Sequence, residues 1–219
     1  MGVSADRTGP GPRSVGAAGV LAAFLFIALF KLRRLGPLDF WAWLALNIVI
    51  VVGLGFIIDR DYVKRLARDL RSGLLRKVGF GIASAAALYG AFAVGRALAL
   101  RLFPFAAAGI DHVYALRTGV PILRVVLLIA LIIGPGEELF WRGFFQERTG
   151  ATTKPAHGFI LTAMLYTAVH LASGNIMLVL AAAVCGAFWG WLYLRFRSPV
   201  LNIISHTLWD LAVFVVFPF

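Results

Sequence analysis

Long runs without charged side chains constrain the fold of this chain more than any other feature of its sequence. Residues 175–194 contain neither an acid nor a base, and residues 38–58 contain a single acid, Asp39, near their edge. About 20 apolar residues, each rising 1.5 Å along a helix, cross the hydrocarbon core of a bilayer. The sequence therefore predicts an all-α, polytopic membrane helical bundle and excludes a soluble domain.

Further apolar segments set the expected number of helices. We predict about seven transmembrane helices, within a range of six to eight, at residues 15–31, 38–58, 78–95, 121–145, 156–172, 175–194 and 199–218. Residues 15–219 then form a single transmembrane domain. Residues 1–14 are rich in Gly, Pro and Arg, which favours a disordered tail. Three bases follow the first apolar run directly, without a small-residue cleavage site, so this run is expected to be a retained anchor.

The chain carries a net charge of +11, which in a soluble protein would suggest a nucleic-acid partner. Here the bases stand between apolar runs, so we interpret them as residues facing anionic membrane lipids and expect no nucleic-acid partner. The tail and segments 59–77, 142–157 and 195–198 hold fourteen Lys and Arg residues, against seven in the alternate segments. This excess predicts a multi-pass protein of the plasma membrane with its N-terminus in the cytoplasm and its C-terminus outside.

Segment 59–77 mixes three acids with seven bases. Leucines at 66, 70, 74 and 75 recur at helical spacing. The pattern predicts an amphipathic helix on the cytoplasmic surface of the membrane. A solvated linker helix is the alternative interpretation.

Ionisable residues inside an apolar segment are costly and usually functional. Glu137 and Glu138 stand side by side in such a segment, directly after Gly-Pro-Gly at 134–136, which should loosen the helix there. Glu138 and Arg142 are four residues apart and share a helical face, which favours a structural ion pair at the site. Glu137 is turned by about 100° from Glu138, so it is free for chemistry. A purely structural cluster of the three charges is the alternative.

Two further pairs at helical spacing carry polar groups in apolar segments. Tyr166 and His170 share one face, and His206 and Asp210 share another. A carboxylate one turn from a histidine can hold its ring and fix its tautomer. A hydrogen-bonded core histidine is the alternative for His170.

The order of these motifs resembles the CAAX protease and bacteriocin-processing family, which includes the Ras-converting CAAX endopeptidases. The motifs are Glu-Glu-x-x-x-Arg at 137–142, aromatic-x-x-x-His at 166–170 and His-x-x-x-Asp at 206–210. The resemblance covers about residues 120–215, which we expect to form the catalytic core. Two positions depart from the family's pattern, since Tyr166 stands where Phe is common and Asp210 where the CAAX-processing enzymes have Asn.

The resemblance implies an intramembrane endopeptidase that cuts a membrane-associated protein or peptide tail. Glu137, aided by His170, would activate a water, and His206, oriented by Asp210, would stabilise the oxyanion. Tyr166 would line the site. We favour this glutamate mechanism without a cofactor. A zinc metalloprotease using Glu137, His170 and His206 stays open. Outside this class, the residues could form a structural network in a non-catalytic immunity or partner-binding protein, or the relay of a small proton-coupled transporter.

Overall fold

The computed structural model of the chain describes residues 10–219, and within them the only β-type pairing is a bridge between Leu35 and Leu38. The elements in order are α1 (Pro12–Leu32), α2 (Phe40–Ile58), α3 (Tyr62–Arg71), α4 (Leu74–Leu102), α5 (Ala106–Ala115), α6 (Ile122–Leu128), η1 (Ile129–Ile133), α7 (Gly134–Glu137), η2 (Glu138–Gln146), α8 (Glu147–Thr152), α9 (Pro155–His170), η3 (Leu171–Ser173), α10 (Ile176–Phe196), α11 (Pro199–Leu211) and η4 (Ala212–Val216). The all-α prediction is confirmed.

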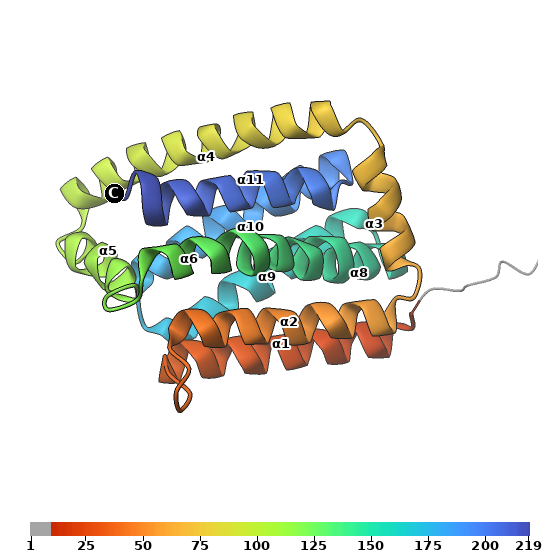
Figure 1. Ribbon diagram of the computed structural model, residues 1–219, viewed down its shortest axis with the longest axis horizontal. Helices are drawn as coiled ribbons and strands as arrows, with labels where there is room; N and C mark the ends of the chain where they lie inside the picture. The colour runs from red at the N-terminus through yellow and green to blue at the C-terminus, as the bar shows by residue number, and fades with distance from the viewer. Residues whose placement is uncertain (1–9) are drawn as a thin grey trace, which may run out of the picture.

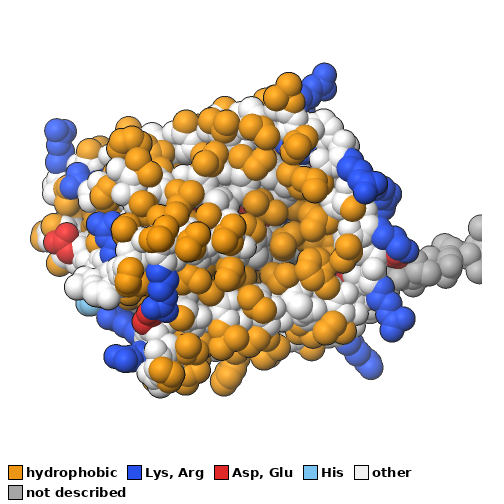
Figure 2. Space-filling view, in the orientation of Figure 1, with side chains coloured by type: hydrophobic (Ala, Val, Ile, Leu, Met, Phe, Trp, Pro, Cys, Tyr) orange, Lys and Arg blue, Asp and Glu red, His pale blue; other side chains and the backbone are white. Residues whose placement is uncertain are grey.

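Six helical stretches of the described chain are long and apolar enough to cross a membrane: 12–32, 40–58, 74–102, 155–173, 176–196 and 199–216. Residues 122–152 add an unbroken helical path in which α-helical and π-helical turns alternate. Figure 2 shows a wide band of hydrophobic side chains across the visible face of the molecule, with most Lys and Arg side chains toward its two ends. This distribution is what a polytopic bundle in a bilayer requires.

The bundle has α3 at one end and α5 at the other (Figure 1). α4 packs along α11, α1 packs along α2, and α9 packs along α10. The path from α6 to α8 runs through the middle and contacts α2, α9 and α11. The central position of this segment lets it present side chains to several helices at once.

The central segment changes its helical form on either side of Pro135. Proline lacks the N–H that a regular helix needs, and the turns on both sides, η1 and η2, are π-helical. The hydroxyl of Tyr62 donates to the carbonyl of Leu139 within η2 at 2.7 Å. A Cβ on Gly143 would lie 1.9 Å from this hydroxyl, so the close approach depends on glycine. The local loosening expected from the sequence is present as widened turns.

Several predicted boundaries differ from the structure. The predicted tail ends at residue 14, but α1 already begins at Pro12, since proline suits the first turn of a helix. Residues 1–9 of that tail lie outside the described residues. The predicted third helix, 78–95, is in fact α4, which spans 74–102. The amphipathic helix predicted within 59–77 is present as α3, but it is shorter than the spacing of the leucines indicated. α3 ends at Arg71, and Gly73 adopts a positive φ of 60° before α4 begins.

The end of the bundle beside α3 is fastened by a buried carboxylate. Asp59 is almost fully buried and accepts two hydrogen bonds from Arg65, at 3.0 and 2.6 Å, and two from Arg148, at 2.5 and 2.6 Å. Burial by itself would raise the pKa of Asp59, but the bonds and charges of the two arginines outweigh it and hold this pKa below its usual value. The contact ties the end of α2 to α3 and α8.

Candidate active site

Glu138 is completely buried and accepts hydrogen bonds from three different side chains. Nη1 of Arg142 and Nδ1 of His206 lie 2.8 and 2.7 Å from its Oε1, and Nδ2 of Asn202 lies 2.9 Å from its Oε2. The three donors come from η2 and α11. A carboxylate occupied on both oxygens in this way is held in place and is not available to a substrate.

Arg142 is equally buried, and its guanidinium group makes cation–π contacts with two aromatic rings. Its guanidinium carbon lies 4.9 Å from the ring centre of Tyr166 and 5.7 Å from that of Trp189. Cation–π contact of this kind lowers the cost of a desolvated cation. Arg142 therefore lies inside the bundle, although the sequence analysis counted it among the basic residues of segment 142–157.

Glu137 has a different environment from its neighbour. One of its oxygens, Oε2, accepts a hydrogen bond from the hydroxyl of Tyr166 at 2.8 Å. Its other oxygen, Oε1, has no hydrogen-bond partner among residues 10–219, and the side chain lines a cavity. The structure therefore holds Glu137 by one oxygen and leaves the other to face the cavity.

His170 lines the same cavity one helical turn beyond Tyr166. Its Nδ1 lies 2.6 Å from the carbonyl oxygen of Tyr166. A carbonyl can only accept, so Nδ1 carries the hydrogen, and in the neutral ring Nε2 keeps a lone pair. The ring also contacts Phe30 of α1, with 4.7 Å between the ring centres. His170 is thereby fixed in one tautomer with a free basic nitrogen.

His206 is held from three directions. Its Nδ1 meets Glu138, its Nε2 lies 3.5 Å from Oδ2 of Asp210, and its ring stacks on Trp189 with 3.6 Å between the ring centres. The sequence predicts Asp210 as the residue that orients this ring, whereas the structure gives the short contact to Glu138. At 3.5 Å the Asp210 contact is beyond a good hydrogen bond.

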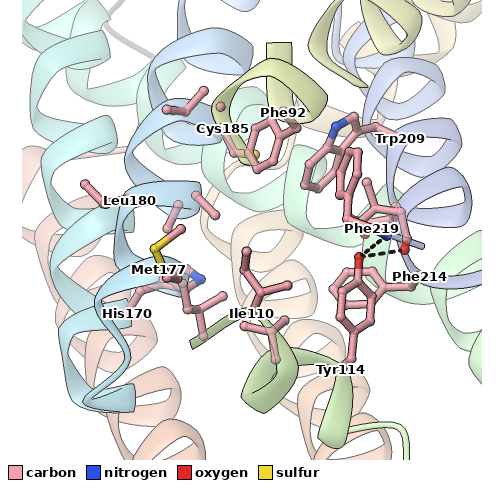
Figure 3. A pocket seen from close by; sticks show the side chains of 18 of the residues that line it. Phe92, Ile110, Tyr114, His170, Met177, Leu180, Cys185, Trp209, Phe214 and Phe219 are labelled. Atoms are coloured by element: carbon pink, nitrogen blue, oxygen red, sulfur yellow. Dashed lines mark hydrogen bonds between the residues drawn. The ribbon is translucent and has the colours of Figure 1, made fainter. Parts of the chain in front are cut away.

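The polar groups line an apolar cavity of about 510 Å³. Glu137, Tyr166, His170, His206 and Asp210 all line it, so the structure brings five of the seven residues singled out from the sequence to one space. Glu138 and Arg142 lie behind them. Figure 3 shows the other walls, formed by aromatic and aliphatic side chains of α4, α5, α10 and the chain after Trp209.

Comparison with known proteins agrees with this arrangement. Residues 119–212 match the model of a family described as type II CAAX prenyl endopeptidase Rce1-like. We call this segment the Rce1-like domain, after the family to which it is similar. The match confirms the resemblance to CAAX proteases, and it holds every residue of the candidate site. No curated protein and no solved structure matches the chain.

The Rce1-like domain contains three residues that the sequence analysis did not assign to the site. Asn202 bonds both Glu138 and the carbonyl of Trp189, Trp189 stacks on His206, and Cys185 lines the cavity. For Asn202 a signal exists, because it stands four residues before His206 on the same helical face. Trp189 and Cys185 lie in an ordinary apolar run, and nothing local marks them.

The side chains considered as a zinc set are not gathered as a ligand cluster in the described part of the chain. Among the described residues, no group of three or more His, Cys, Asp or Glu side chains could together hold a metal ion. Two of the possible ligand atoms bind protein partners, since Oε2 of Glu137 accepts from Tyr166 and Nδ1 of His206 binds Glu138. Glu137, His170 and His206 share a cavity without forming a ligand cluster.

Proposed function

We propose that this protein is an intramembrane endopeptidase in which Glu137 activates the attacking water. The observation that carries the proposal is the contrast between two adjacent glutamates at one cavity. Glu138 is saturated by three donors, whereas Glu137 is held by one oxygen and offers the other to the cavity. In a purely structural network, we would expect the oxygens of both carboxylates to have hydrogen-bond partners. The Rce1-like domain supports the same class of reaction.

Glu137 and His170 provide the base. A water between Oε1 of Glu137 and Nε2 of His170 would find two acceptors for its two protons, which aligns its lone pair with a carbonyl carbon bound in the cavity. Glu137 takes one proton as the water attacks, and it gives that proton to the leaving amine when the C–N bond breaks. Tyr166 keeps the carboxylate in position throughout.

His206 provides the complementary charge. Both of its ring nitrogens face carboxylates, Nδ1 toward Glu138 and Nε2 toward Asp210. A hydrogen on each nitrogen satisfies this arrangement, because a bare lone pair against a carboxylate is repulsive. In the imidazolium form, Nε2–H is the group that would turn from its long contact with Asp210 to the developing oxyanion.

The test is cleavage by the purified protein. Quenched fluorescent peptides with apolar tails, with and without a prenyl group, would be offered to the wild type and to Glu137→Gln. The matched control is Asp111→Asn, which neutralises an exposed acid on α5. We expect Glu137→Gln to lose turnover by at least about a thousandfold while keeping its folded state, and Asp111→Asn to cleave normally. Near-normal turnover of Glu137→Gln would remove it as the base.

A further inference from the structure

The ring of His206 lies flat against the indole of Trp189. The two ring planes are inclined by 19°, and the ring centres are 3.6 Å apart. Both side chains are almost fully buried. A stacked imidazole can slide within its own plane, but it cannot tilt out of that plane without losing the contact. The indole therefore fixes the plane in which Nε2 of His206 can move.

The face of Trp189 also suits the charge that the proposed mechanism gives to His206. The π-electron face of an aromatic ring attracts a cation, and indole does so most strongly among the aromatic side chains. An imidazolium stacked on Trp189 is stabilised in this way without donating a hydrogen bond to it. Both ring nitrogens then keep their other tasks, Nδ1 toward Glu138 and Nε2 toward the oxyanion.

Trp189 is itself held at its backbone and at its ring. Nδ2 of Asn202 donates to the carbonyl of Trp189 at 2.8 Å, and the indole Nε1 donates to Oγ of Ser205 at 3.2 Å. Both partners belong to α11, the helix that also carries His206. A buried indole N–H without an acceptor is costly, so the bond to Ser205 favours one orientation of the ring. The stacking geometry is thus built by α10 and α11 together.

The hydrogen-bonded chain behind Trp189 continues from Ser205 to α4. The hydroxyl of Ser84 lies 2.9 Å from Oγ of Ser205. One helical turn earlier, Gly81 allows a close approach of the two helices, since a Cβ at this position would lie 2.6 Å from Cγ2 of Ile204. Gly81 and Ser84 are three residues apart and share one face of α4, which packs along α11 (Figure 1). α4 lies outside the Rce1-like domain, so this contact joins the two.

We propose that Trp189 is a positioning residue for the reaction and that Ser84 supports it from outside the Rce1-like domain. Trp189 holds His206 in the plane from which Nε2–H reaches the developing oxyanion, and Ser205 and Ser84 hold Trp189. This inference rests on the proposed function, because it takes His206 as the group that stabilises the oxyanion. It extends the catalytic apparatus to α4, which carries none of the motifs found in the sequence.

Histidine-ring resonances test the stacking without requiring catalysis. The chain has four histidines, so protein labelled only at histidine gives few ring signals, and His206→Gln identifies those of His206. The ring current of an indole shifts protons above its face upfield. We expect this shift in the wild type, a smaller shift in Trp189→Phe and its loss in Trp189→Leu. His206 signals that are the same in the wild type and in Trp189→Leu would overturn the proposal.

Ser84→Ala tests the support from α4. Removing this hydroxyl shortens the hydrogen-bonded chain behind the indole, so we expect the His206 signals to move toward those of Trp189→Leu. Ser14→Ala is the matched control, because the Ser14 hydroxyl bonds a backbone carbonyl at the start of α1, away from the site. Unchanged His206 signals in Ser84→Ala would overturn the role of α4.

Cleavage kinetics test whether the stacking matters for the reaction. Trp189→Leu should lower kcat by about tenfold with little change in KM, and Trp189→Phe, which keeps an aromatic face, should recover most of this loss. In a His206→Gln background, Trp189→Leu should have no further effect, whereas a general loss of folded protein would lower kcat by the same factor in both backgrounds. Trp191→Leu changes an exposed residue of the same helix, so it is the control and should cleave normally.

The outcomes separate this inference from the proposed function. An equal loss of kcat in both backgrounds would overturn the positioning role of Trp189. If the wild type cleaves none of the peptides, that result counts against the proposed function, and the histidine resonances still decide whether Trp189 holds His206. If Trp189→Leu does not fold, Trp189→Phe and Ser84→Ala carry the same comparison.

Discussion

Nδ1 of His206 lies 2.7 Å from Oε1 of Glu138, which joins the second histidine of the site to the second glutamate across two helices. The ring is therefore held by a carboxylate on the central segment, and the carboxylate one turn away on its own helix lies farther off, at 3.5 Å. This relationship divides the acids of the site by task. Glu138 binds His206 and Arg142, Glu137 lines the cavity, and Asp210 lies near the other ring nitrogen of His206.

The first prediction concerns Asp210. Because Glu138 already holds the other nitrogen of His206, Asp210→Asn should lower kcat by no more than about tenfold, which corresponds to roughly 1.4 kcal/mol of transition-state stabilisation. KM should stay unchanged, since Asp210 is not expected to bind the ground state. Steady-state kinetics of the purified variant provide the measurement. A loss of several thousandfold would restore Asp210 as the residue that orients His206, and a rate above wild type would favour Asn as a better oxyanion donor.

The second prediction concerns the pair of Glu138 and Arg142. Glu138→Gln leaves a buried guanidinium without its anion, so the free energy of unfolding should fall by roughly 3–5 kcal/mol. The double variant Glu138→Leu with Arg142→Leu removes both charges, and it should be more stable than Glu138→Gln while remaining inactive.

Thermal unfolding in detergent measures these stabilities. Asp39→Asn is the control, because its ion pair with Arg124 is partly exposed and should contribute at most about 1 kcal/mol. If Glu138→Gln unfolds like the wild type, the buried pair does not stabilise the fold.

Local helical geometry explains how much of the site could be predicted from the sequence. The Glu138–Arg142 pair and the spacing of His206 and Asp210 follow from residues four apart on one helix, and the apolar runs around them fix the fold class. Contacts between side chains on different helices cannot be predicted from the spacing of residues in the sequence. The bond from Glu138 to His206 and the stacking of Trp189 on that ring depend on how the central segment, α10 and α11 pack together, and no local pattern encodes this packing.

The interruption of the surface helix shows the same limit on a smaller scale. Leucines at 66, 70, 74 and 75 repeat with helical period, yet Gly73 turns the chain with a positive φ between the second and the third. The period continues across the break because Leu74 and Leu75 belong to α4. Similarly, the cavity is lined by side chains from α1, α2, α4, α5, α9 and α10, and no local pattern predicts how these helices are arranged.

The third prediction concerns metal. Cleavage should persist after exhaustive treatment with chelators, because the carboxylates and imidazoles at the cavity form no three-ligand cluster within the described part of the chain. Elemental analysis of the active fraction should find no stoichiometric zinc. Activity that disappears on chelation and returns in proportion to added zinc would reverse the assignment of Glu137 as a metal-free base.

The last prediction concerns acid stability at the α3 end. The two arginines hold the pKa of Asp59 below its unfolded value of about 3.9 despite its burial. A depressed folded-state pKa stabilises the fold above the unfolded pKa, and this stabilisation is lost as the pH falls through the folded pKa. At pH 7, Asp59→Asn should therefore be less stable than the wild type by roughly 3 kcal/mol, because Arg65 and Arg148 lose their anion. The difference should narrow below about pH 4, where the wild-type carboxylate also becomes neutral.

Unfolding in detergent followed from pH 7 to pH 3 checks this convergence. Asp61→Asn, which removes an exposed acid two residues away, should parallel the wild type across the range. A gap between Asp59→Asn and the wild type that stays constant with pH would show that Asp59 stabilises this end of the bundle by packing and not by its charge.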